Sequence, residues 1–262
     1  MPKGERSIYR SPLVFFIAVM LASLPFWVVG QTTWWTILPG VPLSALMVLV
    51  PGLVAFAFVA RATGVSAAVQ WLATALRPSA LKRVGWLLIA LLMPSALLVA
   101  AYVAMLASGL QLPNPQISFV SAAVLLATFF IPAVFEEVGW SGFALVALQR
   151  RMSALNASLV IGAIWAAWHF IPLLQVERSV AWIGWWSVTT VALRILITWI
   201  FNNAGESVLL AALFHASENA SWQSFPIRGS HYDPAVHAVV LALVCCVVVA
   251  VFGSRTLTRR TE

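Results

Sequence analysis

The chain has 262 residues, of which 62% are hydrophobic and 9% are charged, and its formal net charge at pH 7 is +7. Soluble domains carry about 25% charged residues, so this composition excludes an ordinary soluble protein and predicts a polytopic membrane protein. Long continuous apolar runs predict transmembrane helices rather than a barrel. The basic residues form no stripe with interleaved aromatic side chains, which argues against nucleic-acid binding.

Eight apolar runs come near the roughly 20 residues that a helix needs to cross a bilayer. They cover residues 12–29, 36–60, 86–107, 122–148, 157–175, 180–201, 205–222 and 234–253. The sequence therefore predicts an all-α bundle of about eight transmembrane helices. We expect the first run to be a retained helix rather than a signal peptide, because it is long and no A-x-A cleavage site follows it.

The segment between the second and third runs, residues 64–83, is too polar to cross a membrane. Val69, Trp71 and Leu72 stand there among small residues, and the segment ends in basic residues. This pattern predicts an amphipathic helix that lies on the cytoplasmic leaflet.

The lysines and arginines predict the orientation, because they gather in cytoplasmic loops. Of the 15 in the chain, the cytoplasmic side is expected to hold Lys3, Arg6, Arg10, Arg61, Arg77, Lys82, Arg83, Arg150, Arg151, Arg255, Arg259 and Arg260. The outside holds Arg178 and Arg228, and Arg194 lies within the sixth run. We therefore predict a multi-pass protein of the cell membrane with both termini in the cytoplasm.

Ionisable residues inside a bilayer are costly, and they usually face the bundle interior or a wet cavity. The candidates within the predicted spans are Glu136, Glu137, His169, Arg194, His215 and Glu218. At a rise of about 1.5 Å per residue, Glu136, His169 and His215 lie at similar depths of about 15–18 Å from the cytoplasmic helix ends. Three separate spans thus bring a carboxylate and two imidazoles to one level.

The spacing of these residues suggests acid–base chemistry. His215 and Asn219 share one helical face, because they are four residues apart. Glu136 and Glu137 point about 100° apart, so one can reach a reaction centre while the other takes a supporting partner. A carboxylate near an imidazole can deprotonate water, and an amide beside a second imidazole can donate to an oxyanion.

Two other interpretations remain open from the residues alone. Glu136, His169 and His215 are also a plausible ligand set for a divalent metal such as zinc, although the H-E-x-x-H spacing of zinc proteases is absent. A pair of intramembrane carboxylates also suits a proton-coupled transporter, which would be expected to show paired repeats or broken helices in both halves.

The sequence resembles the CPBP family of intramembrane proteases, which includes CAAX prenyl endopeptidases, bacteriocin-processing and abortive-infection proteins. The resemblance covers about residues 120–222 and rests on Glu136-Glu137 followed by Gly-Trp-x-Gly, on Trp165-x-x-x-His169 and on His215-x-x-x-Asn219. It implies an endopeptidase with a membrane-embedded cavity open to the cytoplasmic leaflet, acting on membrane-associated peptides or proteins. A non-catalytic immunity or scaffold protein of the same family is the alternative.

The resemblance also implies roles for the individual residues. Glu136 would activate water, with His169 as its partner. His215 and Asn219 would support the tetrahedral oxyanion, and Glu137 would be a supporting carboxylate. The family is often described as metalloproteases, and a metal-free mechanism based on glutamate is also argued for it.

Two positions depart from the family pattern. Ser141 stands where the family usually has arginine, and Trp165 stands where it usually has phenylalanine. An arginine inside an apolar run needs an anionic partner or water. We therefore predict that Arg194 approaches Glu137 or Glu136 and takes over the role of the absent arginine; the alternative is that it snorkels to the cytoplasmic headgroups.

These observations divide the chain into three predicted parts. Residues 1–120 form three N-terminal transmembrane helices with the interfacial helix. Residues 121–222 form the CPBP-like catalytic core of four helices. Residues 223–262 form the last transmembrane helix and a basic tail.

Overall fold

The computed structural model describes residues 10–32, 36–38 and 41–259, and nearly all of them are helical. Within these residues, seven helical segments are long and apolar enough to cross a membrane. The prediction of an all-α membrane bundle is therefore confirmed. Lys3, Arg6 and Arg260, which the sequence assigns to the cytoplasmic side, lie outside the described residues.

The seven segments follow the predicted apolar runs closely, but three of them consist of more than one helix. Four segments are single helices: α2 (Pro12–Thr32), α5 (Val84–Ala107), α10 (Val180–Asn203) and α12 (Pro234–Phe252). The second segment consists of η1 (Leu43–Leu49) and α3 (Val50–Thr63). The fourth consists of α6 (Phe119–Glu137), η3 (Val138–Leu145) and α7 (Val146–Gln149). The fifth consists of α8 (Ala154–Trp168) and α9 (Phe170–Gln175).

The eighth predicted run forms a shorter helix, α11 (Val208–Ser224), of 17 residues. Its buried positions lie on most of its circumference, as expected for a helix enclosed by others. Polar residues such as His215 and Glu218 interrupt its apolar sequence. Helix α11 is therefore the core helix of the bundle, and its polar side chains are enclosed by protein.

The predicted start of the second span, residues 36–60, is wrong. Strands β1 (Thr36–Leu38) and β2 (Val41–Pro42) pair in an antiparallel ribbon, and the helical segment begins only at Leu43. The sequence of residues 39–42 is PGVP, in which proline and glycine favour a turn over a helix. Residues 39–40 themselves lie outside the described part of the chain.

The polar segment 64–83 forms two short helices, α4 (Val65–Ala75) and η2 (Pro78–Lys82). They separate just before Pro78, because the residue that precedes a proline is disfavoured in the α-helical region. The predicted helix is thus present, with a break that the sequence analysis did not place. Its position on the cytoplasmic leaflet remains a prediction.

Side-chain caps determine where most helices of the core begin. The hydroxyl oxygens of Ser118, Ser153, Ser179 and Ser207 each accept a hydrogen bond of 3.2 Å from a backbone N–H in the first turn of α6, α8, α10 and α11. Such caps satisfy donors that have no partner within the helix. The four serines therefore fix the starting points of the helices that carry the predicted site.

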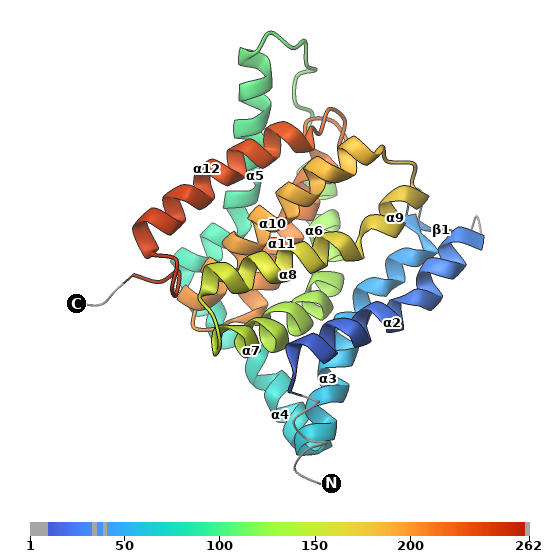
Figure 1. Cartoon of the computed structure of the whole chain (residues 1–262). Helices are drawn as coiled ribbons and strands as arrows, with labels where there is room; N and C mark the ends of the chain where they lie inside the picture. Colours follow the sequence, from blue (N-terminus) through green and yellow to red (C-terminus); the bar gives the residue numbers. More distant parts are fainter. Residues whose placement is uncertain (1–9, 33–35, 39–40, 260–262) are drawn as a thin grey trace.

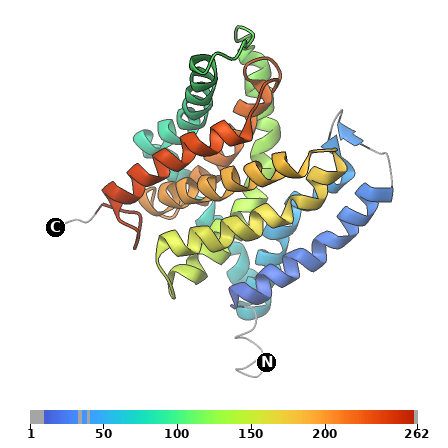
Figure 2. The same cartoon turned by 45° about the horizontal axis from the view of Figure 1, so that its top comes forward.

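The helices form two crossing layers. Helices α12, α10, α8 and α2 run in nearly the same direction in both views, and α10 packs between α12 and α8 (Figures 1 and 2). Behind them, α11 packs against α5 and α6, and α6 packs against α3 (Figure 1). Polar residues that are far apart along the chain thus form a spatial cluster between α6, α8, α10 and α11.

Helix α3 approaches the end of α6 and the start of η3 unusually closely next to the glutamate pair. A Cβ atom on Gly139 would lie 2.6 Å from the backbone of Pro51, and one on Gly52 would lie 2.7 Å from the carbonyl oxygen of Phe135. Any larger residue at these two positions would separate the helices. The glycine of the Gly-Trp motif is therefore explained by packing beside the site.

We expect the 223–233 loop to lie outside the cell and the 64–83 segment to lie in the cytoplasm. In a variant without Cys245 and Cys246, a membrane-impermeant maleimide should label His231→Cys in intact cells, because His231 is exposed in that loop. Ser79→Cys should be labelled only after permeabilisation. Labelling of Ser79→Cys in intact cells would reverse the predicted orientation.

Candidate active site

Glu137, the last residue of α6, is the centre of a buried ion-pair network. Arg194 of α10 donates to both carboxylate oxygens, from Nη2 to Oε1 at 2.6 Å and from Nη1 to Oε2 at 2.9 Å. Both side chains are fully buried. This two-point pairing is the geometry that a guanidinium and a carboxylate favour. The prediction that Arg194 approaches a carboxylate is confirmed, and the alternative that it snorkels to headgroups is wrong.

Ser141 completes this network from the next turn of the helix. Its hydroxyl donates to Glu137 Oε2 and accepts a hydrogen bond of 3.2 Å from Arg194 Nη1. The small side chain leaves room for a guanidinium that comes from α10 instead of from position 141. Gly162 of α8 lies beside this arginine, since a Cβ atom on Gly162 would be 3.3 Å from Arg194 Cβ.

The helix widens directly after the glutamate pair. Residues Val138–Leu145 form the π-helix η3, which was not predicted. Its side chains anchor this turn in the core, because the fully buried Trp140 lies against the rings of Phe15 and Trp168 at centroid distances of 5.8 and 5.6 Å. π-helical turns within α-helices recur at functional sites.

Glu136 points to a different partner. Its Oε2 accepts a hydrogen bond of 2.7 Å from Trp165 Nε1 of α8, and the residue is 3% exposed. Its second oxygen, Oε1, accepts no hydrogen bond from any residue that the structure describes. The two neighbouring carboxylates therefore diverge as predicted: Glu137 is neutralised by an arginine, and Glu136 keeps one oxygen for another group.

Trp165 links all of these groups. Its ring lies under the Arg194 guanidinium, with 4.6 Å between Cζ and the ring centroid, a favourable cation–π geometry. The same ring contacts His215 and His169 edge-on, at centroid distances of 5.0 and 5.9 Å. A phenylalanine at this position could provide the ring but not the hydrogen bond to Glu136.

His169 lies where α8 ends and α9 begins. Its Nδ1 lies 2.9 Å from the carbonyl oxygen of Trp165. Because a carbonyl only accepts, Nδ1 carries the proton, and Nε2 of the neutral ring keeps its lone pair. The rings of Trp168 and Trp186 flank the imidazole at centroid distances of 4.8 and 5.2 Å and fix its orientation.

His215 and Asn219 are one turn apart on α11. His215 Nδ1 lies 3.1 Å from Glu137 Oε1, which orients the ring and leaves Nε2 for another group. Asn219 Oδ1 accepts a hydrogen bond of 3.4 Å from Trp222 Nε1, and its amide nitrogen donates to no described residue. The structure thus joins His215 to Glu137, while Asn219 has no hydrogen bond to the carboxylates or the histidines.

A second buried acid lies outside this cluster. Glu218 Oε1 is 3.6 Å from His237 Nδ1 of α12, and neither carboxylate oxygen has a hydrogen-bond partner among the described residues. Tyr232 also approaches this ring, with its hydroxyl 3.3 Å from Nδ1. Sequence reasoning identified Glu218 as an intramembrane acid but missed His237, because a single histidine at the start of an apolar run has no diagnostic spacing.

The proposed zinc ligands do not form a metal site in this arrangement. Over the part of the chain that the structure describes, no group of three or more His, Cys, Asp or Glu side chains could hold a metal ion. His215 Nδ1 is directed at Glu137, and Glu136 Oε2 is occupied by Trp165. We therefore derive no step through a metal ion.

Comparison with known proteins points to the same part of the chain. The family model of type II CAAX prenyl endopeptidases, Rce1-like, matches residues 118–221. CAAX prenyl protease 2 of Methanococcus maripaludis is 32% identical over 142 residues, which cover 48% of this chain and 51% of that protein. The chain thus spans about half the length of this curated relative. All three motifs lie on α6, α8 and α11 within the matched segment, which is therefore similar to the Rce1-like type II CAAX prenyl endopeptidases.

Proposed function

We propose that this protein is an endopeptidase that hydrolyses a peptide bond of a membrane-associated peptide or protein, with a water molecule activated by Glu136. The observation that carries the proposal is the division between the two carboxylates. Glu137 is fully engaged by Arg194, Ser141 and His215, whereas Glu136 retains one oxygen without a partner among the described residues. A carboxylate with one fixed and one available oxygen suits a general base.

In the proposed reaction, Glu136 Oε1 accepts a proton from water as the water oxygen attacks the carbonyl carbon of the substrate. The carbonyl π electrons move to the carbonyl oxygen, and the resulting oxyanion receives hydrogen bonds from the Asn219 amide and from His215 when its imidazole is protonated. The oxyanion then re-forms the carbonyl, and the C–N bond breaks. His169 Nε2, which holds a lone pair, relays the proton from Glu136 to the departing amine.

The neighbours of His215 support its orientation. Glu137 accepts the Nδ1 proton and so holds the imidazole with Nε2 directed away from this carboxylate. Arg194 pairs with this carboxylate from α10 and supports it without a role in the reaction itself. The buried network thus acts as the support that orients one donor for the oxyanion.

Substrate access from the cytoplasmic side is part of the proposal. A groove of about 350 Å³ lies beside η3 and α7, with Gly142 and Phe143 at one side and Trp71 of α4 at the other. Arg10 and Arg150 line it as well, and both belong to the basic residues predicted in the cytoplasm. This groove begins only a few residues along the helix from Glu137, which supports access to the site from this end.

The function is tested by comparing membrane peptides from cells that produce either the wild-type protein or Glu136→Gln. We expect specific new peptide termini, in segments at or near a membrane, only with the wild-type protein. Purified protein in detergent should then cleave a peptide that spans one of these positions. Identical termini in both cell lines, together with no cleavage in vitro, would favour the non-catalytic scaffold.

We expect Trp165→Phe to lower kcat roughly tenfold, because a hydrogen bond to a charged group contributes on the order of 1.5–3 kcal/mol. The remaining ring still lies under Arg194 and against His215, so the melting temperature should change little. Trp165→Ala is the contrasting variant and should lose both stability and activity. Steady-state kinetics and thermal melts would check this, and unchanged kcat in Trp165→Phe would show that the indole N–H has no role.

A further inference from the structure

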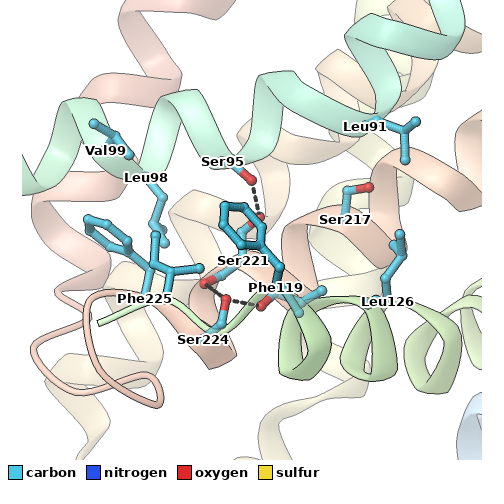
Figure 3. A pocket seen from close by; sticks show the side chains of 14 residues that line it. Leu91, Ser95, Leu98, Val99, Phe119, Leu126, Ser217, Ser221, Ser224 and Phe225 are labelled. Carbon is cyan, nitrogen blue, oxygen red and sulfur yellow. Dashed lines mark hydrogen bonds between the residues drawn. The ribbon is translucent and has the colours of Figure 1, made fainter. Parts of the chain in front are cut away.

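An apolar groove of about 360 Å³ runs along α11, between α5 and α6 (Figure 3). Leu98 and Val99 of α5, Leu126 of α6 and Phe225 after α11 form most of its walls. Its floor is a row of small residues on α11, including Ser217, Ser221 and Ser224, on the side away from His215 and Asn219. The groove is therefore separate from the proposed active site.

The inner end of this groove contains a hydroxyl that the protein does not satisfy. Ser217 is 4% exposed, and its Oγ has no hydrogen-bond partner among the described residues. By contrast, Ser221 shares a hydrogen bond of 2.7 Å with Ser95 of α5 (Figure 3). Ser217 therefore adds one polar atom to the mostly apolar lining of the groove.

A second groove, of about 390 Å³, continues from the first toward the end of the bundle. Ile117 and Ser224 line both grooves, so the two are contiguous. The second groove is polar: Gln116, Gln223 and Arg228 line it, and Ser118 and Ser121 belong to the capped first turn of α6. None of the described residues that line the two grooves is acidic.

The polar groove has the features of an anion site. Arg228 is exposed, and its side chain makes no ion pair or hydrogen bond with any residue in the described part of the chain. The N-terminus of α6, a helix of 19 residues, adds a partial positive charge and unpaired backbone N–H groups. A phosphate group would therefore be favoured in this groove.

A single hydrocarbon chain is thin enough to lie along a groove of about 360 Å³ that is lined mostly by apolar side chains. An amphiphile with an apolar chain and one polar end therefore matches the contiguous apolar and polar grooves.

We propose that the two grooves form one binding site for a membrane lipid with an anionic, phosphate-containing headgroup. The phosphate lies beside Arg228 and the N-terminus of α6, and one acyl chain lies between α5, α6 and α11. The site joins the loop before α6 to the loop after α11, and it is independent of the proposed proteolysis.

Native mass spectrometry of the purified protein tests this with phosphatidylglycerol and phosphatidylcholine that carry the same acyl chains. We expect the wild-type protein to retain phosphatidylglycerol more strongly. Arg228→Gln should lower this retention roughly fivefold, the effect of about 1 kcal/mol per basic residue near a lipid surface, and leave phosphatidylcholine unchanged. Ala123→Phe, which fills the groove, should lower the retention of both lipids.

Two variants serve as matched controls. Arg178→Gln removes the other arginine predicted outside, which stacks on Trp182 at 4.6 Å and lines neither groove. Val124→Phe enlarges a neighbour of Ala123 that is 59% exposed and does not line the groove. Both controls should retain phosphatidylglycerol like the wild type.

The outcome separates the two halves of the proposal. If Arg228→Gln and Ala123→Phe bind both lipids like their controls, the site does not exist. A loss in Arg228→Gln with no change in Ala123→Phe would overturn the acyl-chain half, because a headgroup site alone does not depend on the apolar groove. Thermal melts of each variant confirm that a loss of binding does not come from unfolding.

Discussion

Glu136→Gln should abolish peptide-bond hydrolysis while leaving the protein folded in the membrane. Removal of a general base lowers rates roughly a hundredfold to ten-thousandfold. The glutamine has nearly the same shape, and its amide oxygen can still accept the hydrogen bond from Trp165 that now holds Glu136 Oε2. Cleavage of an identified substrate peptide would be measured with purified protein, alongside a thermal melt.

The neighbouring glutamate provides a contrast to this variant. Glu137→Gln removes the charge that Arg194 faces in a fully buried position, so it should lower both stability and activity. Glu177→Gln is a matched control, because Glu177 is exposed in the loop after α9. The assignment of the base would have to move to Glu137 if Glu136→Gln stayed fully active while a folded Glu137→Gln protein was inactive.

Two further variants extend this test to the groups around the base. His169→Ala and Asn219→Ala should each strongly reduce cleavage and leave the fold intact. For Asn219, loss of one oxyanion donor costs about a hundredfold or more in rate. Normal activity in all three variants, Glu136→Gln included, would contradict the protease assignment.

The apolar pattern of the sequence was sufficient to predict most helices, because continuous apolar runs must form helices in a bilayer. It was not sufficient where local backbone chemistry competes with hydropathy. Residues 39–42 carry a turn sequence inside an apolar run, and the chain forms the β1–β2 ribbon there. The widening of the helix after Glu137 had no sequence signal, because the same residue types suit an ordinary α-helix.

The ion pair of the site could be predicted from the sequence, because a buried charge costs free energy unless it has a partner. Arg194 had to find an anion, and the chain offers few acids, so its pairing with Glu137 followed from charge alone. The partner of His215 was not predictable in the same way. Helical spacing shows which residues share a face, but not which neighbouring helix that face meets. His215 was therefore expected to support the oxyanion with Asn219, and its bond to Glu137 appears only in three dimensions.

Arg194→Leu should destabilise the protein by about 3–5 kcal/mol, the usual effect of leaving a buried charge without its partner. The variant removes both hydrogen bonds to Glu137, the one to Ser141 and the cation–π contact with Trp165. Nothing else in the described surroundings of Glu137 carries a permanent positive charge, so the carboxylate would lose its support. Thermal or denaturant unfolding in detergent would measure the change, and a stability equal to the wild type would refute the role of Arg194.

The serine at position 141 permits a rescue experiment for the same pair. Adding Ser141→Arg to Arg194→Leu places a guanidinium one turn after Glu137, where the family usually carries one, and the leucine leaves the volume that Arg194 filled. We expect this double variant to recover part of the lost stability and activity. Ser141→Arg alone should be destabilising, because two guanidinium groups would then compete for one fully buried carboxylate. Recovery in the double variant, together with damage in both single variants, would establish that Arg194 supplies from α10 the charge that the family supplies from position 141; equal damage in all three would show that only the position on α10 can hold it.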